Sequence, residues 1–296
     1  MSAAAGTTHT PRLVSAEDRN RLQQSFADIP FDAHVSRWDG LYKESFTPWD
    51  RAGPSLALAD LLTDRTDLVP PAQEHEGGAN GKAAEAPPRR TALVPGCGRG
   101  HDALLLSSFG YDVWGLDSSS DAVRMAQENR EAADKDGLYQ PAEGVERGAV
   151  HWLVGDFFDE SWSDGIGTDG TGKFDLIFDY TFLCALPPEA RPRWAKRIAN
   201  LVHSKGRLVC LEFPSGKPLS DPGPPWGLNP ELYEALLATP GEEPEYEADG
   251  TVVYTPCAKP RDDALYRLSI IKPTRTHKAG TADDGTVLDF ISVWTR

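Results

Sequence analysis

A glycine-rich loop between a strand and a helix is the feature that most constrains the fold of this chain. The loop at 94–102 reads VPGCGRGHD, with an apolar run at 91–94 before it and a helical pattern at 101–108 after it. Glycines let the backbone turn tightly and let a ligand approach where a Cβ would block it. A second apolar run, 111–116, ends at the acidic Asp117. This order predicts an open α/β sheet that binds a ligand at the carboxyl ends of its strands.

The rest of the chain continues the alternation of strands and helices. Short β-branched or aromatic runs alternate with longer helical patterns, the order expected of parallel strands joined by crossover helices on both faces of a sheet. Two alternating runs near the C-terminus are suited to pair antiparallel at the sheet edge. The further strands predicted are 150–154, 174–178 and 207–213, the helices are 120–135, 189–202 and 229–237, and the two final runs are 264–271 and 287–295.

The spacing of the loop glycines discriminates between ligands. Gly96, Gly98 and Gly100 form a Gly-x-Gly-x-Gly sequence, whereas a dinucleotide pyrophosphate is bound by Gly-x-Gly-x-x-Gly. His101 stands where the third glycine of that motif would be, and Asp102 at the helix start opposes a bound phosphate. A ligand with an ammonium and a sulfonium, such as S-adenosylmethionine, fits better. Two simpler interpretations stay open: the glycine-rich loop is an ordinary turn without a ligand, and Asp102 is a residue that only begins the helix.

Acidic and aromatic residues follow the other predicted strands. Asp117 can accept hydrogen bonds from both ribose hydroxyls of an adenosine-bearing ligand. Asp156 can accept a hydrogen bond from the adenine amino group, and Phe157 can stack on or flank the adenine ring. Core packing alone would also explain Phe157. Asp179 and Tyr180 end the fourth strand, at the depth expected for a transferred methyl group.

Charge and cysteine content exclude several classes of function. The 296 residues carry a net charge of −15 at pH 7, which repels phosphate backbones and anionic lipids, so we expect neither a nucleic-acid nor a membrane partner. The four cysteines have no metal-ligand or disulfide spacing, and no metal site is predicted. Without a signal-peptide core or a long apolar stretch, the chain is expected to be cytoplasmic.

These motifs together resemble the class I S-adenosylmethionine-dependent methyltransferases, and within them the thiopurine S-methyltransferase-like group that includes halide/thiol methyltransferases of plants and fungi. The resemblance covers most of residues 38–296. Thr-Pro-Trp-Asp combined with Val-Pro-Gly-Cys-Gly is specific to this group. The matching stretches are 47–50, 93–98, 115–117, 156–158, 174–180, 191–195 and 223–225.

The resemblance implies a Rossmann-like, seven-stranded, mostly parallel sheet with an antiparallel C-terminal hairpin. It also implies an N-terminal segment whose tryptophans close over S-adenosylmethionine; Trp38 and Trp49 match two of them, and Tyr42 stands where the plant enzymes have a third. A sulfonium over aromatic faces gains about 0.5–2 kcal/mol. Mammalian thiopurine enzymes have an arginine at the position of Tyr180, so recognition of an anionic purine is not expected. The implied cofactor contacts also include Gly96, Asp117, Asp156, Phe157 and Tyr180.

The expected organisation is an N-terminal extension at 1–30 and a single methyltransferase domain at 31–296, acting as a monomer. The segment 70–90 is rich in Gly, Pro and Ala and predicts a disordered insertion, because it has little surface to bury. The segment 163–173 predicts a flexible loop.

The expected reaction is in-line transfer of a methyl group to the sulfur of a small thiol, with halide or hydrosulfide as further acceptors. Asp179 is a candidate to accept the thiol proton, with a structural or cofactor-holding role as its alternative, and Tyr180 is a candidate to orient the nucleophile. Glu212 is a weaker base candidate, and Cys184 is expected to be buried and inert. Pro225 and Trp226 are candidates for a rigid lid over the substrate or a surface turn.

Three other functions stay open at this point. Methylation of oxygen or nitrogen in another small molecule would use the same sheet and loop. For methylation of amines in nucleic acid or protein, an Asn/Asp-Pro-Pro-aromatic turn would be expected at 179–182, where the chain reads DYTF. A nicotinamide oxidoreductase is disfavoured by the glycine spacing. A non-catalytic S-adenosylmethionine-binding module would carry the same binding motifs and differ only in turnover.

Overall fold

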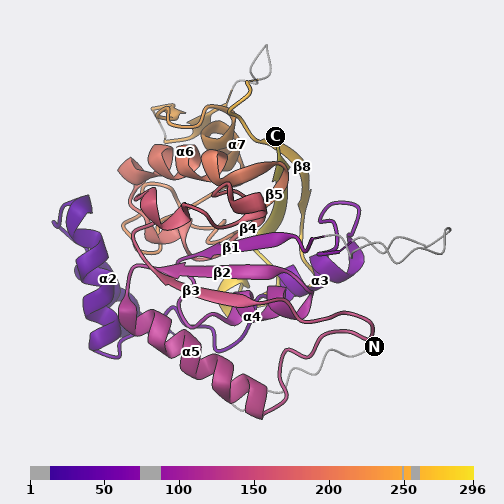
Figure 1. Ribbon diagram of the computed structural model, residues 1–296. Coiled ribbons are helices and arrows are strands. Elements are labelled where there is room, and N and C mark those ends of the chain that lie inside the picture. The colour runs from indigo at the N-terminus through magenta and orange to yellow at the C-terminus, as the bar shows by residue number, and fades with distance from the viewer. Residues whose placement is uncertain (1–13, 74–87, 249, 255–260) are drawn as a thin grey trace, which may run out of the picture.

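A seven-stranded sheet forms the centre of the molecule (Figure 1). The computed structural model describes residues 14–73, 88–248, 250–254 and 261–296. The strand order is β3-β2-β1-β4-β5-β9-β8; the first five strands are parallel, and β9 runs antiparallel between β5 and β8. This confirms the predicted fold class. The strands are β1 Thr91–Pro95, β2 Asp112–Asp117, β3 Val150–Val154, β4 Phe174–Asp179, β5 Val202–Glu212, β8 Tyr266–Ile271 and β9 Phe290–Thr295.

Helices cover both faces of the sheet because its central strands are apolar on both sides. All five residues of β1 are buried, as expected of a strand in the middle of a parallel sheet. In Figure 1 the sheet lies between α6 and α7 above it and α4 and α5 below it. None of the helices in the described part of the chain has the length and apolar character needed to cross a membrane. The covering helices are α4 His101–Ser108, α5 Ser120–Lys135, α6 Arg191–Leu201 and α7 Pro230–Ala238.

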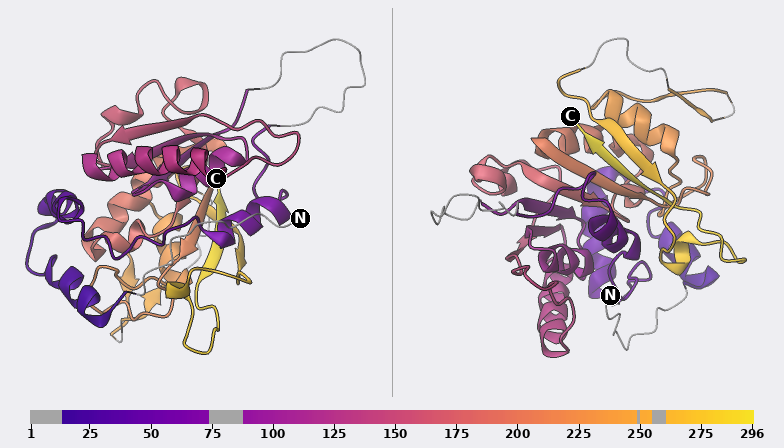
Figure 2. Two further views of the ribbon diagram at one scale, coloured as in Figure 1. Left: turned by 90° about the horizontal axis from the view of Figure 1, so that it is seen from below. Right: turned by 90° about the vertical axis from the view of Figure 1, so that its right-hand side faces the viewer.

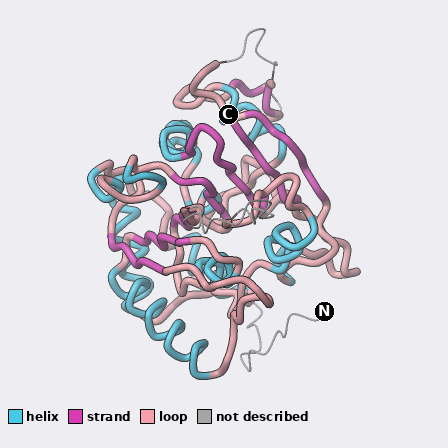
Figure 3. Tube along the Cα trace, turned by 45° about the vertical axis from the view of Figure 1, so that its right-hand side comes forward, coloured by secondary structure: helices cyan, strands magenta, loops and turns pink. Residues whose placement is uncertain are grey.

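The C-terminal strands form the predicted antiparallel pair at one edge of the sheet (Figure 3). The β5 strand is longer than predicted: it starts at Val202, directly after α6, and not at 207. Its pairing with β4 shifts register between Phe174 and Leu176. Gly206 lies at this irregularity, where a Cβ would come within 2.7 Å of the Phe174 carbonyl oxygen. A separate two-stranded sheet joins β6 Glu245–Tyr246 to β7 Val252–Val253.

The N-terminal segment adds three helices that the sequence pattern did not predict: α1 Ala16–Gln24, α2 His34–Lys43 and α3 Leu56–Asp64. Figure 2 shows this segment, in indigo and purple, beside the sheet domain. The part with α1 and α2 has its own small apolar cluster, separate from the main core, whereas the buried residues of α3 belong to the main core. The α2 helix packs against α5. The Ser119 hydroxyl donates to Asp39 Oδ1 at 2.8 Å across that contact. The buried members of the cluster are Leu22, Phe26, Leu41 and Phe46.

The two predicted insertions differ in how far the structure describes them. Residues 74–87 of the first lie outside the described residues. The second contains a short 3₁₀ turn, Thr168–Gly170, and the Thr168 hydroxyl donates to Asp175 Oδ2 on β4 at 2.9 Å. Its flexibility and the division of the chain at residue 30 stay predictions.

Candidate active site

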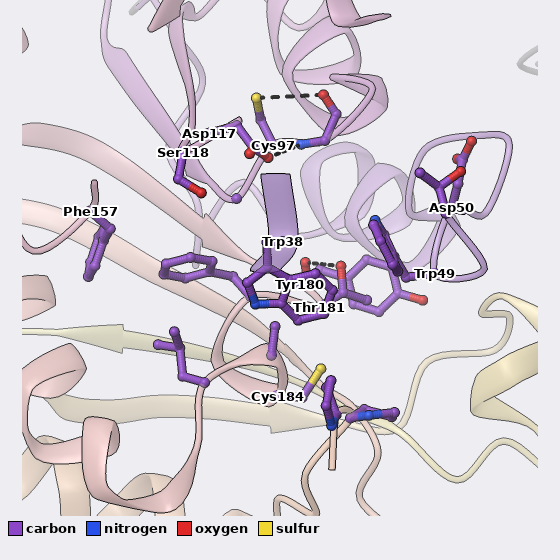
Figure 4. A pocket seen from close by; sticks show the side chains of 18 of the residues that line it. Trp38, Trp49, Asp50, Cys97, Asp117, Ser118, Phe157, Tyr180, Thr181 and Cys184 are labelled. Carbon is purple, nitrogen blue, oxygen red and sulfur yellow. Dashed lines mark hydrogen bonds between the residues drawn. The ribbon is translucent and has the colours of Figure 1, made fainter. Parts of the chain in front are cut away.

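A cavity of about 540 Å³ lies at the carboxyl ends of the parallel strands. Its lining comes from the loops after β1, β2, β3 and β4 on one side and from the N-terminal segment on the other. This is the place where open α/β sheets bind ligands, and the volume suits a ligand of nucleoside size. Figure 4 shows Asp117 and Ser118 at one side of the cavity, Trp38 and Tyr180 near its middle and Cys184 on the opposite side.

The loop after β1 and the last residue of β2 form a surface that we call the glycine floor, made of Gly96, Cys97, Gly98, Arg99 and Asp117. Gly96 has φ +59°, and a Cβ there would lie 2.4 Å from the Phe182 ring. Gly98 has φ +52°, and its Cβ would lie 3.1 Å from the Tyr42 hydroxyl. Both glycines line the cavity. Gly100, also left-handed, does not line it, because its Cα faces the Trp152 ring; it turns the chain into α4.

Asp117 lies at the end of β2 and lines the cavity while being only 7% exposed. Its Oδ2 accepts a hydrogen bond from the Gly98 amide and its Oδ1 from the Ser119 amide, each at 3.0 Å. Burial raises its pKa to about 6 despite these bonds. Each carboxylate oxygen has a second lone pair, so Asp117 can still accept the two hydroxyls of a ribose.

The loop after β3 brings Asp156 and Phe157 to the same cavity. Asp156 Oδ1 accepts the Phe158 amide at 2.9 Å. Phe157 is buried and packs edge-on against Phe158 and Phe182, at 5.3 Å and 5.0 Å between ring centroids. The Phe157 ring therefore packs in the core and also lines the cavity, so its position is compatible with both predicted roles, core packing and contact with adenine.

Three aromatic residues of the N-terminal segment form a surface that we call the aromatic roof: Trp38, Tyr42 and Trp49. All three line the cavity. The rings of Trp38 and Trp49 meet edge to face at 4.9 Å, and Trp49 Nε1 donates to the Tyr42 hydroxyl at 3.2 Å. Aromatic faces attract cations, so this surface suits a sulfonium.

Polar contacts from acidic side chains join the roof segment to the floor. Asp50 contacts Arg99 at 2.9 Å and His101 at 3.5 Å. Asp102 lines the cavity, and its Oδ1 accepts the Ser55 amide at 2.7 Å. Burial raises the pKa of Asp102 to about 6. Asp102 thus also anchors the start of α3, a contact that its position at a helix start did not predict.

Asp179 and Tyr180 lie side by side in sequence but point to different surroundings. Asp179 is 2% exposed and is not among the residues lining the cavity; its carboxylate accepts from the Leu183 amide at 3.1 Å and from Trp194 Nε1 at 2.8 Å. This geometry favours the structural role of its two predicted roles. Tyr180 lines the cavity, and its hydroxyl hydrogen-bonds with His277 Nδ1 at 3.1 Å.

Of the two predicted lid residues, one lines the cavity and the other does not. Pro225 lines the cavity, whereas Trp226 is not among its lining residues and stacks on His34 at 6.0 Å. The Trp226 amide donates to the Cys184 carbonyl at 2.8 Å. Cys184 lines the cavity, and burial raises the pKa of its thiol. Glu212 is fully buried away from the cavity.

Sequence reasoning missed Arg51, Phe213 and His277. Arg51 and Phe213 line the cavity, and the Arg51 guanidinium lies 5.3 Å from the centre of the Phe213 ring. The His277 ring stacks on Tyr180 at 5.6 Å, and burial lowers its pKa to about 4, so it is neutral at pH 7. Arg51 directly follows the Thr-Pro-Trp-Asp motif, which was the available signal. His277 has no local signal, because 97 residues separate it from Tyr180.

Comparison with known proteins agrees with this geometry. Residues 81–257 match the family described as Thiopurine S-methyltransferase. The chain is 32% identical over 206 residues to probable thiol methyltransferase 2 of Arabidopsis thaliana, covering 70% of this chain and 73% of that protein. It is 30% identical over 213 residues to thiocyanate methyltransferase 1 of Brassica oleracea, covering 72% and 76%, and 29% identical over 161 residues to a Bordetella petrii thiopurine S-methyltransferase, covering 52% and 67%. The chain therefore belongs to the thiopurine S-methyltransferase family.

Proposed function

We propose that this chain transfers a methyl group from S-adenosylmethionine to the sulfur of a small acceptor, a thiol or thiocyanate. Membership of the family makes it an S-adenosylmethionine-dependent S-methyltransferase. The observation that carries the assignment to this cavity is that Asp117 and Tyr180 both line it. We infer that the nucleoside binds at the Asp117 side, called the nucleoside part, and the acceptor at the Tyr180 side, called the acceptor part. Both parts belong to one continuous cavity, which in-line transfer requires.

The residues of the glycine floor and aromatic roof fit the methyl donor. We expect Asp117 to accept the ribose hydroxyls, and Asp156 and Phe157 to hold the adenine. A Cβ at Gly96 or Gly98 would meet a neighbouring side chain, so these positions leave room for a ligand close to the backbone. When bound, S-adenosylmethionine supplies an electrophilic methyl group on a positively charged sulfur. Trp38 and Trp49 present the aromatic faces that attract such a charge.

The acceptor part of the cavity favours sulfur over oxygen or nitrogen. The Tyr180 ring meets the Phe213 ring at 6.1 Å between centroids, and Cys184 and Pro225 line the same cavity. The imidazole that hydrogen-bonds with Tyr180, His277, is a weak base with a pKa of about 4. Among the described residues, no carboxylate hydrogen-bonds with the Tyr180 hydroxyl. A thiol, with a pKa of about 8.5, ionises near neutral pH without a strong base, whereas an alcohol does not. Apolar walls also exclude water from a weakly hydrated nucleophile.

In this mechanism the chain's residues mainly bind, orient and exclude water. Tyr180 fixes the position of the nucleophile through its ring and hydroxyl, and the hydrogen bond to His277 holds that hydroxyl. Burial raises the pKa of Tyr180, so the phenol stays protonated and uncharged beside the nucleophile. Asp179 acts indirectly, since it secures the turn after β4 through the Leu183 amide and Trp194.

The remaining predictions on partners and location belong to this proposal. The acidic net charge supports a chain that acts on small molecules and not on nucleic acid. A monomer in the cytoplasm is the arrangement that we propose. A non-catalytic binding module is the second candidate, and turnover separates the two.

The test is a panel assay with labelled S-adenosylmethionine and matched aromatic acceptors: thiophenol, phenol and aniline, together with thiocyanate. We expect product from thiophenol and thiocyanate, and rates at least 100-fold lower for phenol and aniline. S-adenosylhomocysteine binding without transfer to any acceptor would overturn the enzymatic assignment and favour the binding module.

A further inference from the structure

Arg51 places a positive charge at the acceptor part of the cavity, and none of the roles derived above uses it. It comes directly after the roof segment and lines the cavity together with Tyr180, Cys184 and Phe213. The Arg51 side chain is partly buried, and its buried Nε has no hydrogen-bond partner. A buried donor without a partner costs free energy, and a ligand of opposite charge would satisfy it.

The Arg51 guanidinium has no acidic partner among the described residues. None of the ion pairs within 4 Å in the described part of the chain includes it, and its buried Nε has no hydrogen-bond partner. The group instead lies over the face of Phe213 at 5.3 Å. Its charge and at least one of its donors are thus free for a ligand.

Charged groups of both signs act on the acceptor part. Asp102 and Asp289 oppose ionisation of Tyr180, Asp179 and Asp289 oppose ionisation of Cys184, and Lys217 favours ionisation of Cys184. The Arg51 guanidinium favours the ionised forms of Tyr180 and Cys184 and opposes protonation of His277. Arg51 also lowers the pKa of Asp289, which is buried outside the cavity lining; no ion pair among the described residues joins Arg51 to Asp289. Neutral His277 contributes no charge of its own at pH 7.

The other arginines of the cavity lining are engaged elsewhere. Arg99 pairs with Asp50 at the floor. Arg193 lies over the Phe31 and Phe158 rings, beside the predicted adenine contacts. Arg19 donates to the Val14 carbonyl. Arg51 is therefore the arginine of this lining that is available to an acceptor beside Tyr180.

We propose that Arg51 is the residue that binds the acceptor, and that it binds the acceptor in its anionic form. This inference rests on the proposed function and specifies its acceptor. The anionic sulfur uses a lone pair to form the new S–CH₃ bond, and the electron pair of the broken bond remains on the donor sulfur. One anion and one cation thus give two neutral products, and no further proton acceptor is required.

This charge balance predicts where Arg51 acts. Because the negative charge disappears during transfer, a fixed cation stabilises the bound anion more than the transition state. Arg51 therefore acts on acceptor binding and on thiol ionisation, and it contributes little to the maximal rate. A residue that only supported the fold would instead alter S-adenosylhomocysteine binding as well.

The test compares Arg51→Gln and Arg51→Lys with the wild-type chain, and uses Arg124→Gln as a control with the same charge change. Arg124 lies exposed on α5 and pairs with Asp121 and Glu128. With Arg51→Gln we expect the KM for thiocyanate to rise at least tenfold, with kcat and the Kd for S-adenosylhomocysteine changed less than threefold. Arg51→Lys should recover most of the loss, and Arg124→Gln should behave as wild type.

Two further measurements separate this inference from the proposed function. Calorimetric binding of thiocyanate to the S-adenosylhomocysteine complex should weaken tenfold in Arg51→Gln, whether or not the wild type turns over. The pH midpoint of kcat/KM should rise by about one unit for an alkyl thiol but stay unchanged for thiocyanate, which is always ionised. A thiocyanate affinity within twofold of wild type, or an equal loss of S-adenosylhomocysteine affinity, would overturn the role of Arg51.

Discussion

The glycine floor and the aromatic roof enclose the same cavity but are stabilised in different ways. The floor continues from β1, whose residues belong to the main core, and its backbone depends on left-handed glycines. Trp38 and Trp49 of the roof pack against a separate cluster with four buried residues. A segment with few buried contacts has lower local stability than a core strand. We therefore expect the floor to determine whether a nucleoside binds at all and the roof to adjust how well its charge is recognised.

The largest effect is expected from Asp117→Ala in the floor. Two hydrogen bonds from ribose hydroxyls to a carboxylate contribute about 3 kcal/mol, which corresponds to a loss of affinity of roughly 100-fold. Calorimetric titration with S-adenosylhomocysteine measures it. Asp121→Ala on α5, where Asp121 pairs with Arg124, is the control and should bind normally. Equal S-adenosylhomocysteine affinities for the two variants would show that Asp117 does not bind the ribose.

A smaller loss, about 30-fold in S-adenosylhomocysteine affinity, is expected from Gly96→Ala. The Gly137→Ala variant is its matched control, because Gly137 also has positive φ, +67°, but a Cβ there would meet no atom within 4 Å. Both variants should lose about 1–2 kcal/mol of stability from the strained backbone. Only Gly96→Ala adds the contact with Phe182, so thermal unfolding and calorimetry together isolate it. Similar binding losses in both would show that backbone strain alone is responsible.

Lowering the pH from 8 to 5 should reduce the affinity of the glycine floor for S-adenosylhomocysteine by about tenfold. The pKa of Asp117 is raised to about 6, so its carboxylate is ionised above that pH and neutral below it. The hydrogen bonds from ribose are therefore fully available at pH 7 and are lost as the pH falls through 6. About a tenth of the group is ionised at pH 5. The Kd for S-adenosylhomocysteine measured from pH 8 to 5 should follow this curve, and Asp117→Asn should flatten it; an unchanged curve in that variant would assign the dependence to another group.

The smallest effect is expected from Trp38→Leu in the roof. Losing one cation–π contact of about 1 kcal/mol weakens S-adenosylmethionine binding about fivefold, while neutral S-adenosylhomocysteine should bind within twofold of wild type. Trp38→Phe keeps an aromatic face and should recover most of the difference. Equal losses for both ligands would mean that the roof contributes shape and not charge recognition.

The floor was predictable from sequence because its determinants are local. The strand, the glycine spacing and Asp117 lie within 27 residues, and the observed bounds of α4 and α5 coincide with the predicted ones. The roof was found only through the resemblance to a family. The α1 helix, with the sequence AEDRNRLQQ, has a single buried residue, Leu22, so its apolar pattern was too weak to indicate a helix.

The acceptor part was predicted least well, for two physical reasons. Successive residues of a strand point to opposite sides, and only the structure showed that Tyr180 and not Asp179 faces the cavity. Arg51, Phe213 and His277 come from three distant segments that the folded sheet brings together. No local spacing carries that information.

A crystal structure of the S-adenosylhomocysteine complex tests the central claim most directly. We expect the ribose hydroxyls on Asp117, the adenine beside Phe157, and the sulfur under Trp38, facing Tyr180. A nucleoside bound with its ribose away from Asp117, or with its sulfur directed away from Tyr180, would contradict that claim.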